Sequence, residues 1–142
     1  MGERNYERLM SIALLGLVVV LLVACEGGYT TTGIRTTSHQ DMRGGDLTVK
    51  IKKANGSSTQ EIEIGGSGLT LDTDVRLSVE EGTFKLELLD SEGDVTLTLE
   101  AREGQTLSGS GRMVTDSFGD AQYRVTATEA KNVEYHFDYT FR

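Results

Sequence analysis

From Asp46 to the end of the chain, apolar residues recur at every second position, which is the spacing of a β-strand with one buried face. The run DLTVKIKK places Leu47, Val49 and Ile51 on one face and polar residues on the other. No ten-residue stretch of this region has the 3.6-residue period of an amphipathic helix. This alternation predicts a domain built from strands, with essentially no helix.

Further runs with the same alternation follow, separated by residues that favour turns. Their inward positions are predicted to be Ile62, Ile64, Leu69, Leu71, Val75, Leu77, Val79, Phe84, Leu86, Leu88, Val95, Leu97, Leu99, Tyr123, Val125, Ala127, Val133, Tyr135, Phe137, Tyr139 and Phe141. The predicted turns are Asn55-Gly56, Gly65–Gly68, Glu80–Thr83, Asp90–Asp94 and Lys131-Asn132. The chain has 17 glycines and no proline, which agrees with many short strands joined by glycine-rich turns.

Residues 46–142 are therefore predicted to form an antiparallel, jelly-roll-like β-sandwich of seven to eight strands. Each strand has one polar face, so two sheets must cover each other's apolar faces. A chain of 142 residues allows one domain of ordinary size.

A different pattern occupies residues 1–24. Ile12 to Ala24 is an uncharged run of thirteen apolar or small residues. As a helix it would rise about 20 Å, which is short of the roughly 30 Å of membrane hydrocarbon. We interpret residues 1–24 as a cleaved helical signal peptide rather than a membrane-spanning anchor.

The run ends in Leu22-Val23-Ala24-Cys25, which resembles the lipobox of bacterial lipoproteins. The resemblance implies that a diacylglyceryl group is attached to the Cys25 thiol and that the chain is then cleaved between Ala24 and Cys25. It also implies that the new amino group can be acylated. The alternative is an incidental cysteine after an ordinary signal peptide; Cys25 is the only cysteine in the chain, so it has no disulfide partner within it.

Lipidation would hold the protein at the extracytoplasmic side of the cell membrane, because the lipid on Cys25 would insert into the bilayer. Each buried methylene contributes about 0.8 kcal/mol, so two or three acyl chains hold firmly. Residues 25–45 are rich in Gly, Thr and Ser, and we predict that they form a flexible linker to the domain. A minor alternative is a recognition segment that uses Tyr29, Ile34 and His39.

The formal net charge is −8, which argues against nucleic acid or an anionic membrane surface as a partner.

The run FKLELLDSEGDV and the later GDAQYRV resemble β-sandwich modules of small extracytoplasmic bacterial lipoproteins and jelly-roll modules of some secreted proteases. Phe84, Leu88, Asp90, Gly93 and Tyr123 carry this resemblance. No functional residue is transferred from it.

Metal sites have weak candidates. Glu134, His136 and Asp138 share one strand face, where adjacent members lie about 7 Å apart, so two of them could chelate a metal but three could hardly converge. A solvated polar face explains these residues as well, and we predict no metal site. Asp72-Thr73-Asp74 and the Asp90–Asp94 segment invite a calcium interpretation, but turn chemistry accounts for such residues, and Asp90–Asp94 lacks the distal glutamate of an EF-hand.

No catalytic residue is predicted. The chain has no G-x-S-x-G elbow, and no carboxylate pair is marked out. Gly109-Ser110-Gly111 is predicted to be a loop, but not a phosphate-binding loop, because no Lys-Ser/Thr follows it. No cofactor is expected beyond the lipid on Cys25. The leading hypothesis is a non-enzymatic envelope lipoprotein that binds another envelope protein or a small ligand. The alternatives are an accessory subunit of an enzyme or glycan-binding system, and a structural spacer.

Overall fold

The computed structural model describes residues 28–142, so the predicted signal peptide and the lipobox with Cys25 lie outside the described residues. Seven strands occupy most of this region: β1 (Thr30–Thr32), β2 (Arg35–Gln40), β3 (Gly44–Glu63), β4 (Thr70–Leu89), β5 (Val95–Ala101), β6 (Thr106–Val114) and β7 (Asp120–Phe141). Every pairing between them is antiparallel. Among residues 28–142, no helix is long and apolar enough to cross a membrane.

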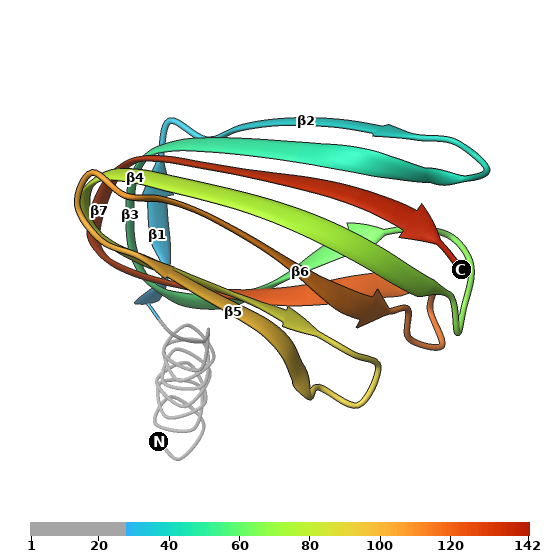
Figure 1. Cartoon of the computed structure of the whole chain (residues 1–142). Helices are drawn as coiled ribbons and strands as arrows, with labels where there is room; N and C mark the ends of the chain where they lie inside the picture. The colour runs from blue at the N-terminus through green and yellow to red at the C-terminus, as the bar shows by residue number, and fades with distance from the viewer. Residues whose placement is uncertain (1–27) are drawn as a thin grey trace, which may run out of the picture.

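All seven strands belong to one sheet, which folds over on itself. The sheet order is β1-β3-β7-β4-β5, with β2 also pairing with β3 and β6 with β4. The three central strands β3, β7 and β4 are 20, 22 and 20 residues long. All three curve over at the same end of the molecule, while the β2–β3, β3–β4, β4–β5 and β6–β7 connections and the C-terminus lie at the opposite end (Figure 1).

This shared bend divides the sheet into two layers. The first layer contains β2, β6, residues 44–51 of β3, 70–79 of β4 and 133–141 of β7. The second layer contains β5, residues 56–63 of β3, 83–89 of β4 and 120–127 of β7. The predicted jelly-roll-like β-sandwich is confirmed in its class, and its two layers are the two halves of the same three strands.

The bend is where three predicted turns prove wrong. Asn55-Gly56, Glu80–Thr83 and Lys131-Asn132 do not reverse the chain but lie inside β3, β4 and β7. The pairing register shifts between Ala54 and Gly56 and between Glu81 and Thr83. Positive φ values at Gly56, Gly82, Glu129 and Asn132 are used for bulges that bend the strands. The turns predicted at Gly65–Gly68 and Asp90–Asp94 do join strands.

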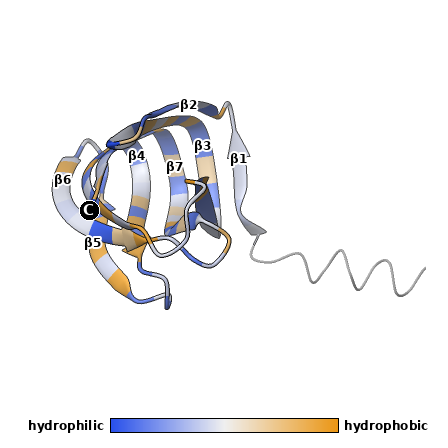
Figure 2. Ribbon diagram, turned by 90° about the vertical axis from the view of Figure 1, so that its right-hand side faces the viewer, coloured by the Kyte–Doolittle hydropathy of each residue, from blue (hydrophilic) through white to orange (hydrophobic). Residues whose placement is uncertain are grey.

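The core lies between the two layers, and the alternation predicted it well. Figure 2 looks along the strands from the end opposite the bend and shows them curving around this core. Of the predicted inward residues, Leu69, Leu97 and Phe141 are only partly buried, and Val95 is 44% exposed. The others are buried. Phe84, Tyr123, Tyr135 and Phe137 form a cluster of ring contacts with centroids 4.9–5.8 Å apart.

The predicted flexible linker is wrong for most of residues 30–40. In the structure, β1 pairs with residues 53–55 of β3, and β2 pairs along residues 45–50 of the same strand. Tyr29 is half-buried against the core. These strands carry Thr and Ser where apolar residues would alternate, so they have no buried face for the sequence pattern to reveal.

Candidate functional site

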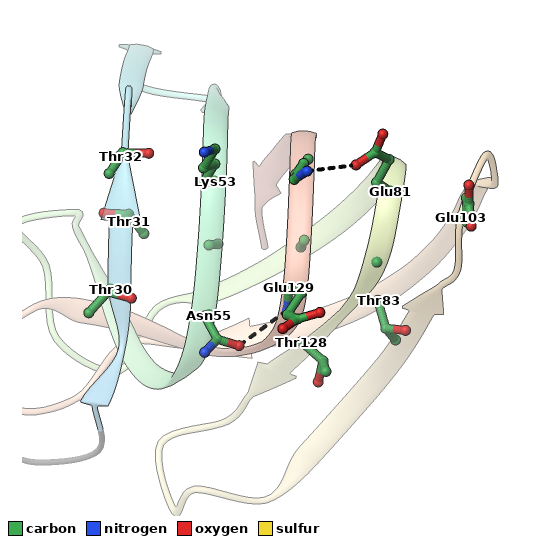
Figure 3. Close-up of a pocket in the computed structure, with 14 residues that line it drawn as sticks. Thr30, Thr31, Thr32, Lys53, Asn55, Glu81, Thr83, Glu103, Thr128 and Glu129 are labelled. Carbon is green, nitrogen blue, oxygen red and sulfur yellow. Dashed lines mark hydrogen bonds and ion pairs between the residues drawn. The ribbon is translucent and has the colours of Figure 1, made fainter.

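A large surface depression lies over the bend, and we call it the bend hollow. It has a volume of about 850 Å³ and is lined by β1, the bends of β3, β4 and β7, and the β5–β6 loop. Figure 3 shows its side chains, which are mostly hydroxyl, amide and charged groups. A volume of this size is in the range of small-molecule sites, but no aromatic side chain lines it.

Charges of both signs meet in the bend hollow. Lys131 Nζ lies 3.1 Å from Glu81 Oε2, and the Glu129 backbone N–H donates to Asn55 Oδ1 at 3.2 Å. Both contacts are drawn in Figure 3. Lys53 is paired in register with Lys131. None of the ion pairs among residues 28–142 includes Lys53. The hollow therefore offers one unpaired ammonium group beside hydroxyl groups and carboxylates.

A second candidate lies on the outer face of the first layer, and we call it the aspartate row. Asp46 of β3 is in register with Asp138 of β7, and Asp138 is in register with Asp74 of β4. Directly opposite residues of neighbouring strands have Cβ atoms about 4.5–5.5 Å apart. None of the three aspartates belongs to an ion pair within the described part of the chain.

Three shallow depressions follow the aspartate row, with volumes of about 400, 510 and 620 Å³. Asp138 lines all three of them. Ser110 closes the row on β6, where its hydroxyl donates to Asp74 Oδ1 at 2.5 Å. The row thus marks the middle of a hollowed, negatively charged strip across four strands.

The outer face of the second layer is arranged differently. Arg124 donates two hydrogen bonds of 3.1 Å to the Glu87 carboxylate, and Lys85 Nζ lies 3.7 Å from it. The hydrogen bond from Arg124 is the main cause of a lowered Glu87 pKa. Opposite charges are therefore cross-strand neighbours on this face, and such pairs stabilise a sheet. In the aspartate row, by contrast, like charges are cross-strand neighbours.

The predicted weak metal candidates do share one face of β7, but two of the three have other partners. Glu134 pairs with Lys50 at 3.9 Å, and His136 Nδ1 is hydrogen-bonded to Thr48 Oγ1 at 2.7 Å. Asp138 belongs to the aspartate row. Within residues 28–142, no group of three His, Cys, Asp or Glu residues is arranged to hold a metal ion.

The two segments with a calcium interpretation also have local explanations. Asp72 Oδ2 lies 2.8 Å from Arg142 Nη2, and Asp72 Oδ1 lies 3.9 Å from Arg112 Nε. Asp90 Oδ1 accepts backbone hydrogen bonds of 2.9 Å from Glu92 and from Asp94, which is ordinary turn chemistry.

The Thr48–His136 contact resembles nucleophile activation, and it was not predicted from the sequence. The two residues are 88 positions apart, so only strand pairing brings them together. A triad also needs a carboxylate that orients the imidazole, and no hydrogen bond from His136 to a carboxylate occurs within the described residues. Gly109-Ser110-Gly111 lies within β6 rather than in a loop.

Comparisons with known proteins give no family. No family model and no curated protein sequence matches this chain. Among solved structures, a pilus protein of Bacillus endospore appendages is similar with a TM-score of 0.48 and 11% identity, over 79% of this chain and 92% of that chain. The carbohydrate-binding module TmCBM61, solved with β-1,4-galactotriose, has a TM-score of 0.44 and 14% identity, over 82% and 86%.

A bacteriophage CBA120 tailspike protein has a TM-score of 0.39 and 11% identity, over 82% of this chain but only 19% of that chain. At such identities and TM-scores, these likenesses support no inference about ligand or activity.

Proposed function

We propose that this protein is a lipid-anchored, extracytoplasmic and non-enzymatic binding module. The observation that carries the proposal is the motif Leu22-Val23-Ala24-Cys25 at the end of an apolar run too short to span a membrane. The single cysteine stands where a lipobox requires the residue that receives the lipid. The following domain is a β-sandwich that would display polar surfaces outside the cell membrane.

The surface proposed to bind a partner is the aspartate row. Like charges in direct register are unfavourable for the sheet, and none of the ion pairs in residues 28–142 relieves them. A positively charged group that bound along the row would gain from three carboxylates at once. We therefore propose a partner with a basic segment, either an envelope protein or a small cationic ligand.

The anchoring is tested by mass spectrometry of the full chain purified from bacterial membranes. We expect the chain to begin at Cys25 and to carry the added mass of a diacylglyceryl group. Cys25→Ser should remain uncleaved and unlipidated, whereas the control Thr32→Ser should be processed normally. An unmodified thiol, or a chain that still begins with Met1, would refute the anchoring.

The binding surface is tested by photo-crosslinking of the anchored protein in living cells, with the crosslinker at Thr140, beside the row. We expect a crosslinked species that the double variant Asp74→Asn, Asp138→Asn loses and that the control Glu61→Gln keeps. Glu61 is an exposed carboxylate on the outer face of the second layer. If the double variant keeps the crosslinked species at full strength, the row is not the binding surface.

A further inference from the structure

Charge is divided unevenly along the length of the sandwich. We define the bend end as residues 28–35, 50–57, 78–85, 100–106 and 126–134, and the loop end as the remaining described residues. The bend end contains seven basic residues (Arg35, Lys50, Lys52, Lys53, Lys85, Arg102 and Lys131) and six acidic residues (Glu80, Glu81, Glu100, Glu103, Glu129 and Glu134). The net charge of the bend end is therefore close to zero.

The loop end carries the acidity of the whole domain. It contains five basic residues (Arg43, Arg76, Arg112, Arg124 and Arg142) and thirteen acidic residues (Asp41, Asp46, Glu61, Glu63, Asp72, Asp74, Glu87, Asp90, Glu92, Asp94, Asp116, Asp120 and Asp138). The argument from net charge against an anionic membrane surface thus applies to the loop end and not to the bend end.

The proposed lipidation site is close to the bend end along the chain. Gly28 is three residues from Cys25, so their Cα atoms are at most about 11 Å apart. Two residues later, β1 pairs with the bend of β3. The first-layer part of β4, Thr70 to Val79, spans about 30 Å from the loop end toward the bend. A chain tethered at Cys25 therefore starts with its bend end at the membrane surface.

We infer that the bend end is a membrane-docking surface that contacts the phospholipid headgroups and holds the acidic loop end away from the bilayer. This inference rests on the proposed lipidation of Cys25. Lys52 and Lys53 are exposed on the bend of β3, and Ile34, in the β1–β2 connection, is 57% exposed. Ammonium groups can meet lipid phosphates, while an anionic leaflet repels the loop end, so the docked domain stands upright.

The orientation is measured with the lipidated full chain in vesicles of phosphatidylcholine with a minor fraction of phosphatidylglycerol. A donor dye is attached to Thr128→Cys at the bend end or to Met42→Cys at the loop end, and the acceptor dye is on lipid headgroups. Thr128 lines the bend hollow and Met42 is 98% exposed. We expect energy transfer several-fold more efficient from position 128 than from position 42. Equal transfer from both positions would overturn the inference.

Charge-reversal variants distinguish docking of the bend end from an orientation that the tether alone would produce. Lys53→Glu changes an exposed residue of the bend end, and Arg43→Glu makes the same change at an exposed residue of the loop end. We expect Lys53→Glu to lower energy transfer from position 128 on vesicles with phosphatidylglycerol, and Arg43→Glu to leave it unchanged. If the two variants behave alike, the charge of the bend end does not orient the domain.

Vesicle flotation distinguishes this inference from the anchoring on which it rests. A wild-type chain that does not float with vesicles would refute both the lipidation of Cys25 and the docking. A chain that floats but shows equal energy transfer from positions 128 and 42 would refute only the docking. Maleimide should not label the wild-type chain, because its one thiol is occupied by lipid.

Discussion

Asp138 lies directly opposite Asp74 across the β7–β4 ladder, with both carboxylates on the outer face of the first layer. On its other side, Asp138 is opposite Asp46 of β3. The central residue of the aspartate row therefore has a like charge as its neighbour on each side. The Asp138 carboxylate should therefore destabilise the folded domain while it favours the binding of a basic partner.

Neutralising this central carboxylate should stabilise the domain. Asp138→Asn removes two like-charge contacts, and we expect the free energy of unfolding at neutral pH to rise by about 0.2–1 kcal/mol. Urea unfolding in low salt measures the change, with Glu61→Gln as the control. The gain should shrink as salt is added, because salt screens exposed charges. A loss of stability in Asp138→Asn would show that the aspartate is structurally required.

The bend of β4 should tolerate only glycine at position 82. Gly82 has a φ of 76°, and an added Cβ would collide with the backbone carbonyl oxygens of Thr128 and Glu129. Gly93, in the β4–β5 turn, has a φ of 83° with nothing within 4 Å of an added Cβ. We expect Gly93→Ala to cost about 1–2 kcal/mol, for its left-handed backbone alone, and Gly82→Ala to cost clearly more. Thermal melts of the two variants, side by side, measure the difference.

The same bend explains what the sequence could not predict. Gly56, Gly82 and Asn132 have the positive φ that hairpin turns and strand bulges both require, so the residues alone do not say whether the chain reverses. The choice depends on pairing between distant segments, because β3, β4 and β7 bend together. Three short segments, Asn55-Gly56, Glu80–Thr83 and Lys131-Asn132, therefore decide between short hairpins and long bent strands.

The sequence predicts which side chains are buried better than it predicts which strands pair. The alternation in DLTVKIKK and VEYHFDYTF is local, so it identifies the inward residues whatever the strand order is. The aspartate row was not visible, because Asp46, Asp74 and Asp138 come together only through the β3–β7–β4 order. For β2, the usable signal was its β-branched threonines, which favour strands even without a buried face.

The Glu87–Arg124 contact predicts a dependence of stability on pH. The folded pKa of Glu87 is lowered, first by the hydrogen bond from Arg124, so its stabilisation is present above the unfolded glutamate pKa and is lost as the pH falls through the folded pKa. Because Arg124 is 40% exposed, we expect a modest loss of about 1 kcal/mol in Glu87→Gln at neutral pH. Urea unfolding from neutral to acidic pH should show the two proteins converge.

The hydrogen bond between Tyr123 and Tyr135 gives the most discriminating test of the core. Their hydroxyl oxygens lie 2.9 Å apart between the layers, and both side chains are buried. Each single Tyr→Phe variant removes one partner and leaves the other hydroxyl unsatisfied, at a cost of about 1–3 kcal/mol. The double variant Tyr123→Phe, Tyr135→Phe removes both polar groups and should be nearly neutral. Urea unfolding of all four proteins at neutral pH completes the cycle.

The same tyrosines should make the domain sensitive to alkali. Burial raises the pKa of Tyr123 from 10.0 to about 12, and burial also raises the pKa of Tyr135. The unfolded chain releases these protons near pH 10, whereas the folded chain retains them. Their contribution is therefore complete below pH 10 and is lost as the pH rises toward about 12. Stability of the double Phe variant should fall less steeply over this range, and an equally steep fall would show that neither tyrosine is responsible.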